Sequence, residues 1–235
     1  MFSGSTSLIG LIVLDSSGIP TGGVLSPDDV ERVAQLALEH DVLVLSDEIY
    51  DHMYYEEAPA SIMSVDGLEE RTVLVTGFSK TYAMTGWRLG YSVVPQWLVD
   101  PIVRLINSSV SCTPQFVQMA GLEALSGPQA DSIEMMRLLK ERRDLMVEGL
   151  NAIPGMSCRV PRGAFYAFPN VSALGLSSSA LARMLLEDGG VAVLPGTAFG
   201  PEGEGYIRLC FSTSVEQIRE ALGRIRRVAA RLYTG

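Results

Sequence analysis

The chain has 235 residues, of which 47% are hydrophobic and 19% are charged. This length and composition predict a globular protein with one large core or two adjoining cores. Lysine and arginine total 18 against 27 aspartates and glutamates, and the net charge of -9 argues against binding to nucleic acid or to anionic membrane surfaces. We therefore expect a small-molecule partner.

The cysteines and histidines indicate neither a disulfide framework nor a metal site. Cys112, Cys158 and Cys210 are odd in number and widely spaced, and His40 and His52 belong to no recognisable metal-binding pattern. The start of the chain has an apolar run without a preceding basic region, and no stretch reaches membrane-spanning length. We expect a cytoplasmic protein that binds no metal.

The first part of the chain alternates apolar, β-branched runs with amphipathic segments, which is typical of a parallel sheet covered by helices. Ser26 supplies a helix cap before Pro27, and that helix is expected to end near His40. The apolar runs predict strands at 8–15, 42–45, 72–76 and 89–94.

The second part of the chain has a different pattern, which predicts a long amphipathic helix at about 129–153 followed by shorter elements. We expect strands near 158–168, 191–194 and 206–211, and helices near 179–187 and 215–232. The sequence therefore predicts an α/β fold with two domains, a mostly parallel domain over residues 1–140 and a smaller α+β domain over residues 141–235.

Ionisable side chains follow two of the predicted strands. Asp47 and Glu48 come directly after the strand at 42–45, and Lys80 comes after the strand at 72–76. Ligands in open α/β sheets bind beyond the carboxyl ends of the strands, so these are the places where we expect a site.

The run from Ser79 to Tyr91 contains Lys80 followed by Gly86-Trp87-Arg88, with Asp47-x-x-Tyr50 upstream and Arg208 downstream. This combination resembles the class I/II aminotransferase family of fold-type I pyridoxal-phosphate (PLP) enzymes. The likeness runs from about residue 8 to residue 231. It implies that residues 1–140 are the C-terminal part of the large PLP-binding domain and that 141–235 are the small domain.

The resemblance implies a role for each of five residues. Lys80 would form a Schiff base with the cofactor aldehyde, since burial lowers a lysine pKa and frees the neutral amine. Asp47 would pair with the ring nitrogen, Tyr50 would hydrogen-bond the phenolic oxygen, and Arg88 would bind the phosphate. Arg208 would bind the α-carboxylate of the substrate.

Each of these residues also has a plainer interpretation. Lys80 would be a surface lysine, Asp47 a helix cap, and Tyr50 an ordinary packing residue. Arg88 would form a surface ion pair, and Arg208 would form a structural salt bridge with an acid elsewhere.

The sequence departs from the family pattern in three respects. Ile19 stands before Pro20 where the family usually has an asparagine that bonds the cofactor, and Gly77 stands where many relatives have a phosphate-binding serine. Family members also begin well upstream of Met1, so we expect a truncated chain with an exposed sheet edge. Such a chain is expected to catalyse slowly.

By resemblance, the expected activity is PLP-dependent transfer of an amino group from an amino acid to a 2-oxo acid. The full-length protein is expected to form a homodimer. Two alternatives stay open, namely another fold-type I PLP reaction by a lyase or synthase, and a non-catalytic remnant that associates with a partner.

Overall fold

The computed structural model describes residues 10–15 and 18–232, which form two compact units. The first unit contains residues 10–15, 24–52 and 58–129. The second contains residues 18–23, 53–57 and 130–232. Helix α5 (Ala130–Asn151) belongs as a whole to the second unit, so the predicted division between residues 140 and 141 falls inside a continuous helix.

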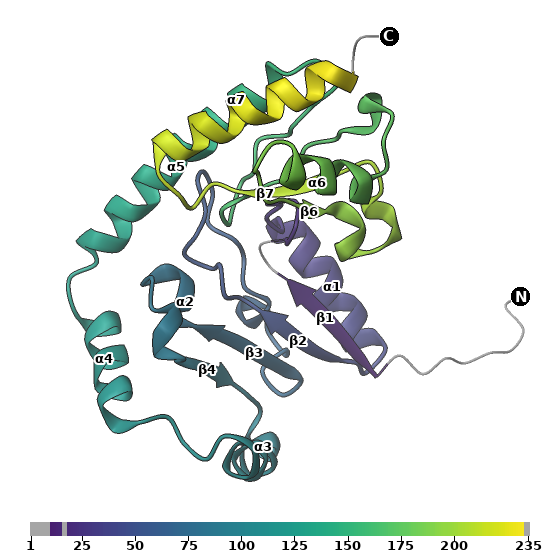
Figure 1. Ribbon diagram of the computed structural model, residues 1–235. Helices are drawn as coiled ribbons and strands as arrows, with labels where there is room; N and C mark the ends of the chain where they lie inside the picture. Colours follow the sequence, from purple (N-terminus) through teal and green to yellow (C-terminus); the bar gives the residue numbers. More distant parts are fainter. Residues whose placement is uncertain (1–9, 16–17, 233–235) are drawn as a thin grey trace, which may run out of the picture. The chain divides into compact units, whose positions relative to one another are not determined.

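The first unit is built on a four-stranded sheet in the order β1-β2-β3-β4 (Figure 1). β1, β2 and β3 are parallel, and β4 is antiparallel to β3. The predicted mostly parallel sheet is therefore confirmed, although residues 8 and 9 of its first predicted strand lie outside the described residues. The strands are β1 (Leu11–Asp15), β2 (Leu43–Asp47), β3 (Thr72–Gly77) and β4 (Gly90–Val93).

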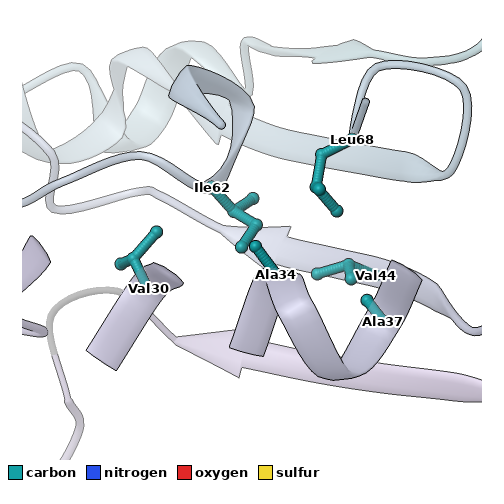
Figure 2. Packing of buried hydrophobic residues seen from close by; sticks show 6 residues of the cluster. All are labelled: Val30, Ala34, Ala37, Val44, Ile62 and Leu68. Carbon is teal, nitrogen blue, oxygen red and sulfur yellow. The ribbon is translucent and has the colours of Figure 1, made fainter. Parts of the chain in front are cut away.

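Helix α1 (Pro27–Glu39) packs on this sheet. It begins with a reciprocal cap, in which the Ser26 hydroxyl accepts from the Asp29 amide and the Asp29 carboxylate accepts from the Ser26 amide. Its buried side chains meet the middle of β2 and the loop beyond it, where a short 3-10 helix runs from Ile62 to Ser64. Figure 2 shows the core that results, formed by Val30, Ala34, Ala37, Val44, Ile62 and Leu68.

Three further α-helices lie in the described part of the first unit. The four-residue helix α2 (Phe78–Thr81) follows β3 directly, while α3 (Gln96–Ser109) and α4 (Gln115–Ser126) follow β4. Gly121 lets α4 approach closely, because a Cβ there would lie 2.4 Å from Cδ2 of Leu89 and 3.3 Å from Cζ of Phe78. This close packing holds the base of the short helix that carries Lys80.

The second unit is the predicted α+β arrangement. A small antiparallel sheet, in the order β5-β7-β6, packs with three helices, and α7 runs alongside α5 (Figure 1). Its strands and α-helices after α5 are β5 (Tyr166–Ala167), α6 (Ser178–Glu187), β6 (Leu194–Pro195), β7 (Ile207–Cys210) and α7 (Val215–Leu232).

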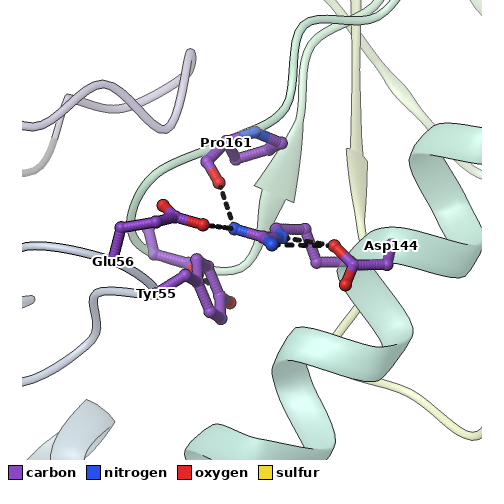
Figure 3. A network of polar contacts seen from close by, with 6 residues as sticks. Tyr55, Glu56, Asp144 and Pro161 are labelled. Atoms are coloured by element: carbon purple, nitrogen blue, oxygen red, sulfur yellow. Dashed lines mark hydrogen bonds and ion pairs between the residues drawn. The ribbon is translucent and has the colours of Figure 1, made fainter.

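A buried arginine on α5 fixes residues 53–57 within the second unit (Figure 3). Nη1 of Arg143 donates to Oε1 of Glu56 at 2.8 Å and to the Pro161 carbonyl at 3.0 Å. Its Nε donates to Oδ1 of Asp144 at 2.8 Å, and its guanidinium carbon lies 4.5 Å from the centroid of the Tyr55 ring. All these partners compensate the burial of the charge.

Candidate active site

The carboxyl end of β2 carries the first group of candidate residues. Asp47 is the last residue of the strand and lies in register with Val75 of β3. Its side chain is exposed, and Oδ1 accepts a hydrogen bond from the Ile49 amide at 3.1 Å. A turn follows at this point, so Asp47 caps a turn and not a helix.

Lys80 and Tyr50 are brought together at this edge of the sheet. Lys80 lies on α2, one turn beyond the end of β3, and its Nζ is 5.9 Å from the centroid of the Tyr50 ring. Tyr50 is only 2% exposed, whereas Lys80 is half-buried. The amine is thus close to a fixed aromatic ring and is not fully surrounded by water.

The environment of Arg88 differs from that of Asp47, Lys80 and Tyr50. It is exposed, has left-handed backbone angles (φ 55°, ψ 45°), and its Nη1 donates to the Thr85 carbonyl at 3.0 Å. It lines a cavity of about 870 Å³ with Ala83, which also has a positive φ of 52°. No carboxylate of the described residues pairs with Arg88, which leaves the surface ion pair without support. Strained non-glycine backbone of this kind is enriched at functional sites.

Two acidic residues that the sequence pattern left without a role also lie at this edge. Asp15, the last residue of β1, is in register with Asp47 on the neighbouring strand. Glu48 is 6% exposed, and burial raises its pKa despite hydrogen bonds from the hydroxyls of Ser61 and Ser46. Glu48 follows the predicted strand at 42–45, and the alternation of Val44, Ser46 and Glu48 along the chain indicates that its side chain points inward. Asp15 was expected only as the last residue of the first strand.

Arg208 belongs to the second unit and lies on β7. Its guanidinium carbon is 4.2 Å from the ring centroid of Tyr166 and 4.5 Å from that of Phe199. No acidic side chain among the described residues forms an ion pair with it, so the alternative of a structural salt bridge finds no support there. The flanking rings hold a cation whose charge is available to an external anion.

The two residues that depart from the family pattern, Gly77 and Ile19, have different surroundings. Gly77 lies opposite Gly90, and a Cβ added at Gly77 would be 3.0 Å from the Leu89 carbonyl oxygen and 3.1 Å from Cα of Gly90. The close approach of β3 and β4 thus leaves little room for a side chain at this position. Ile19 lies in the second unit, precedes a cis bond to Pro20, and is 38% exposed.

The chemistry of the donor set fits pyridoxal phosphate. Lys80 supplies an amine, Tyr50 a phenol and Asp47 a carboxylate at one edge of the sheet, and Arg88 supplies a guanidinium in the same unit. These groups match the aldehyde, phenolic oxygen, ring nitrogen and phosphate of that cofactor. Within residues 10–15 and 18–232, no three His, Cys, Asp or Glu side chains are grouped to hold a metal ion. The helices of this part also lack the length and apolarity to cross a membrane.

Known proteins resemble the chain over most of its length. YugH of Bacillus subtilis (strain 168) is 46% identical over 216 residues, which are 92% of this chain and 56% of that protein. The aspartate aminotransferase of Pyrococcus abyssi (strain GE5 / Orsay) is 41% identical over 220 residues, with the same two coverages. The crystal structure of an aromatic aminotransferase from Pyrococcus horikoshii OT3 matches with a TM-score of 0.91 at 40% identity, covering 94% of this chain and 60% of that one.

The chain therefore spans little more than half the length of the relatives that it matches. A family model described as "Aminotransferase class I and II" matches residues 5–225. This match covers nearly all of the sequence and includes each of the five predicted site residues. The chain belongs to the aminotransferase class I and II family.

Proposed function

We propose that this chain takes part in pyridoxal-phosphate-dependent transfer of an amino group from an amino acid to a 2-oxo acid. The observation that carries the proposal is the meeting of Lys80 and Tyr50 beyond two adjacent parallel strands, with Nζ 5.9 Å from the ring centroid. Family membership points to the same chemistry, and the aspartate and aromatic aminotransferases among the relatives act on amino acids by their names.

Each residue has a defined task in this proposal. The cofactor, when bound, withdraws electrons from the substrate's α-carbon and stores the amino group. Nζ of Lys80 holds the cofactor and then moves the α-proton as a general base. The Asp47 carboxylate keeps the ring nitrogen protonated, the Tyr50 hydroxyl donates to the phenolic oxygen, and the Arg88 guanidinium binds the phosphate.

Arg208 is proposed to bind the α-carboxylate shared by amino-acid and 2-oxo-acid substrates. The support is a guanidinium placed between the rings of Tyr166 and Phe199, without an acidic partner among the described residues. A planar cation with free donors binds a carboxylate through two parallel hydrogen bonds. A lysine at this position would lose that geometry.

Two finer features of the whole protein are also proposed. We infer a cytoplasmic location from three free cysteines, of which Cys112 and Cys210 are exposed. We infer a homodimer from the family resemblance and from the apolar side chains that α4 exposes, Phe116, Met119, Leu122 and Leu125.

The test uses the fact that the sequence contains only two lysines, Lys80 and Lys140. The chain is incubated with pyridoxal phosphate, reduced with borohydride and mapped by mass spectrometry. We expect the label on Lys80, its loss in Lys80→Arg, and its retention in Lys140→Arg, because Lys140 is exposed on α5. Labelling of Lys140 with Lys80 unmodified contradicts the proposal.

The reaction itself is assayed with an amino acid and a 2-oxo acid as partners. Formation of the new amino acid supports transfer, while release of ammonia or carbon dioxide identifies the lyase or synthase alternative. Pyridoxal phosphate that binds at Lys80 without any product identifies the non-catalytic alternative.

A further inference from the structure

The turn after β2 is supported from within the protein by one buried carboxyl group. Glu48 is 6% exposed, although its neighbour Asp47 is exposed. Oε1 of Glu48 accepts a hydrogen bond from the Ser46 hydroxyl at 3.0 Å and another from the Ser61 hydroxyl at 2.8 Å. Two donors from different segments therefore converge on a single oxygen atom.

The backbone of Glu48 is tied down as firmly as its side chain. Its amide donates to the Val75 carbonyl of β3 at 2.8 Å. Its carbonyl accepts from the Thr76 hydroxyl at 3.1 Å and from the Asp51 amide at 3.0 Å. Every polar group of the main chain at this position has a partner, so the residue is a fixed point between β2 and the turn.

We propose that Glu48 is a positioning residue, whose buried carboxyl holds the turn so that Asp47 and Tyr50 keep the orientation that the cofactor requires. This inference rests on the proposed function, because Asp47 and Tyr50 are its proposed cofactor ligands. Glu48 acts through these two residues, since its own carboxyl is directed to Ser46 and Ser61.

The cost of burying this group favours a positioning role over simple space filling. A buried carboxyl without donors is strongly unfavourable, and an apolar residue would fill the same space without that cost. Directed hydrogen bonds restrain side-chain and backbone angles in a way that apolar contacts do not. Catalytic geometry is sensitive to displacements of about 1 Å, so such restraint at Asp47 and Tyr50 has functional value.

The experiment compares Glu48→Ala, Glu48→Gln and Ser61→Ala with the parent chain. Glutamine keeps an acceptor oxygen for both serines, so it serves as the conservative rescue. Asp41→Asn is the control, because Asp41 precedes β2 and its carboxylate pairs with Arg71 at 2.8 Å at the opposite end of the strand. Amide hydrogen exchange of residues 46–52 is measured without cofactor. The dissociation constant for pyridoxal phosphate and the pH midpoint of its bound absorbance are measured by titration.

We expect Glu48→Ala to speed exchange at residues 46–52 and to raise the dissociation constant about tenfold or more, the worth of one hydrogen bond to a charged group. Its pH midpoint should move by about half a unit, because the groups around the chromophore are displaced. Glu48→Gln should bind within about threefold of the parent, Ser61→Ala should show a smaller effect in the same direction, and Asp41→Asn should match the parent.

A folded Glu48→Ala protein with the parent's dissociation constant and pH midpoint overturns the inference, even if exchange is faster. If Glu48→Ala does not fold, the same readouts on Ser61→Ala decide, and unchanged values there overturn it as well. A parent chain that binds no pyridoxal phosphate refutes the proposed function, and the cofactor role of Glu48 is refuted with it.

Discussion

The amine of Lys80 lies 5.9 Å from the centroid of the Tyr50 ring, and the two residues follow adjacent parallel strands. Tyr50 is fixed by burial, whereas Lys80 sits on a four-residue helix that follows β3 without an intervening loop. The short connections leave neither side chain much freedom to move away from the other. Substitutions at Lys80 and Tyr50 are therefore the most direct tests of the candidate site.

Tyr50→Phe tests the role of the Tyr50 hydroxyl separately from that of its ring. The variant keeps the aromatic ring near Lys80, so we expect the parent fold and covalent capture at Lys80. The proposed hydrogen bond to the cofactor is lost, and binding of pyridoxal phosphate should weaken by about 1.5–3 kcal/mol. Absorbance titration measures the dissociation constant, and Tyr54→Phe is the control. Equal affinity for Tyr50→Phe and the parent would show that the hydroxyl does not bind the cofactor.

Two threonines on β3 provide a matched test of buried hydroxyls. The Thr72 hydroxyl is buried and has no hydrogen-bond partner among the described residues, whereas the Thr76 hydroxyl donates to the Glu48 carbonyl at 3.1 Å. Because valine has nearly the same shape, Thr72→Val should be neutral or should stabilise by up to about 1 kcal/mol, and Thr76→Val should destabilise by about 1 kcal/mol. Urea denaturation gives both values. The reverse order of stability would contradict the described hydrogen bonding.

Arg143 and Arg137 test the buried network on α5. Arg143→Lys should lower the free energy of unfolding by about 1–3 kcal/mol, because a lysine cannot reach Glu56, Asp144 and the Pro161 carbonyl in fixed directions. Arg137 pairs with Glu134 and Glu141 on the surface of the same helix, so Arg137→Lys should change little. Chemical denaturation followed by circular dichroism measures both variants, and equal losses would rule out a special role for burial.

Glu48 predicts a pH dependence of stability. Burial raises its pKa, so the folded state holds the proton more tightly than the unfolded state. The resulting stabilisation is fully present below the unfolded pKa of about 4.3 and is lost as the pH rises through the folded pKa. The side chain of Glu48→Gln cannot ionise, so the variant does not lose stability in this way as the pH rises.

The stability of Glu48→Gln relative to the parent should therefore increase with pH above about 4 and level off once the parent carboxyl is ionised. Urea denaturation at several pH values between about 4 and 8 measures this difference. Asp51, whose pKa is also raised by burial, titrates in both proteins, and its negative charge adds to the rise of the Glu48 pKa in the parent. A difference that does not change with pH would contradict the prediction.

Local sequence patterns predicted much of this fold, for reasons that particular elements make clear. The strands were visible as short apolar runs, and α1 had Ser26 and Pro27 to mark its start. Helices α3 and α4 were not predicted. Each follows a proline, Pro95 or Pro114, without a side-chain cap, and α3 contains Pro101 within its length. Packing of Val117 and Gly121 supports α4 against these local signals, whereas α3 has no buried residue.

The candidate residues were predicted from strand ends and from the family resemblance, but their partners were not. No sequence spacing indicates that the rings of Tyr166 and Phe199 flank Arg208, because only the folding of the chain brings each ring next to the guanidinium. Glu48 and Asp47 are adjacent acids with similar local propensities, yet one is buried and the other exposed. Glu48 continues the alternation of buried side chains at Val44 and Ser46, and the Ser61 hydroxyl, 13 residues away, donates to its carboxylate.

The short segments 18–23 and 53–57 limit how this protein can be divided into modules. The Arg162 amide donates to the Gly22 carbonyl at 2.8 Å, and the Ala164 amide donates to the Met53 carbonyl at 2.8 Å. A gene fragment starting at residue 130 would encode every helix and strand of the second unit but neither acceptor. Unpaired buried amides are costly, so recombination at that single point would transfer an incomplete module. The second unit is expected to be inherited together with parts of the sequence that precede it.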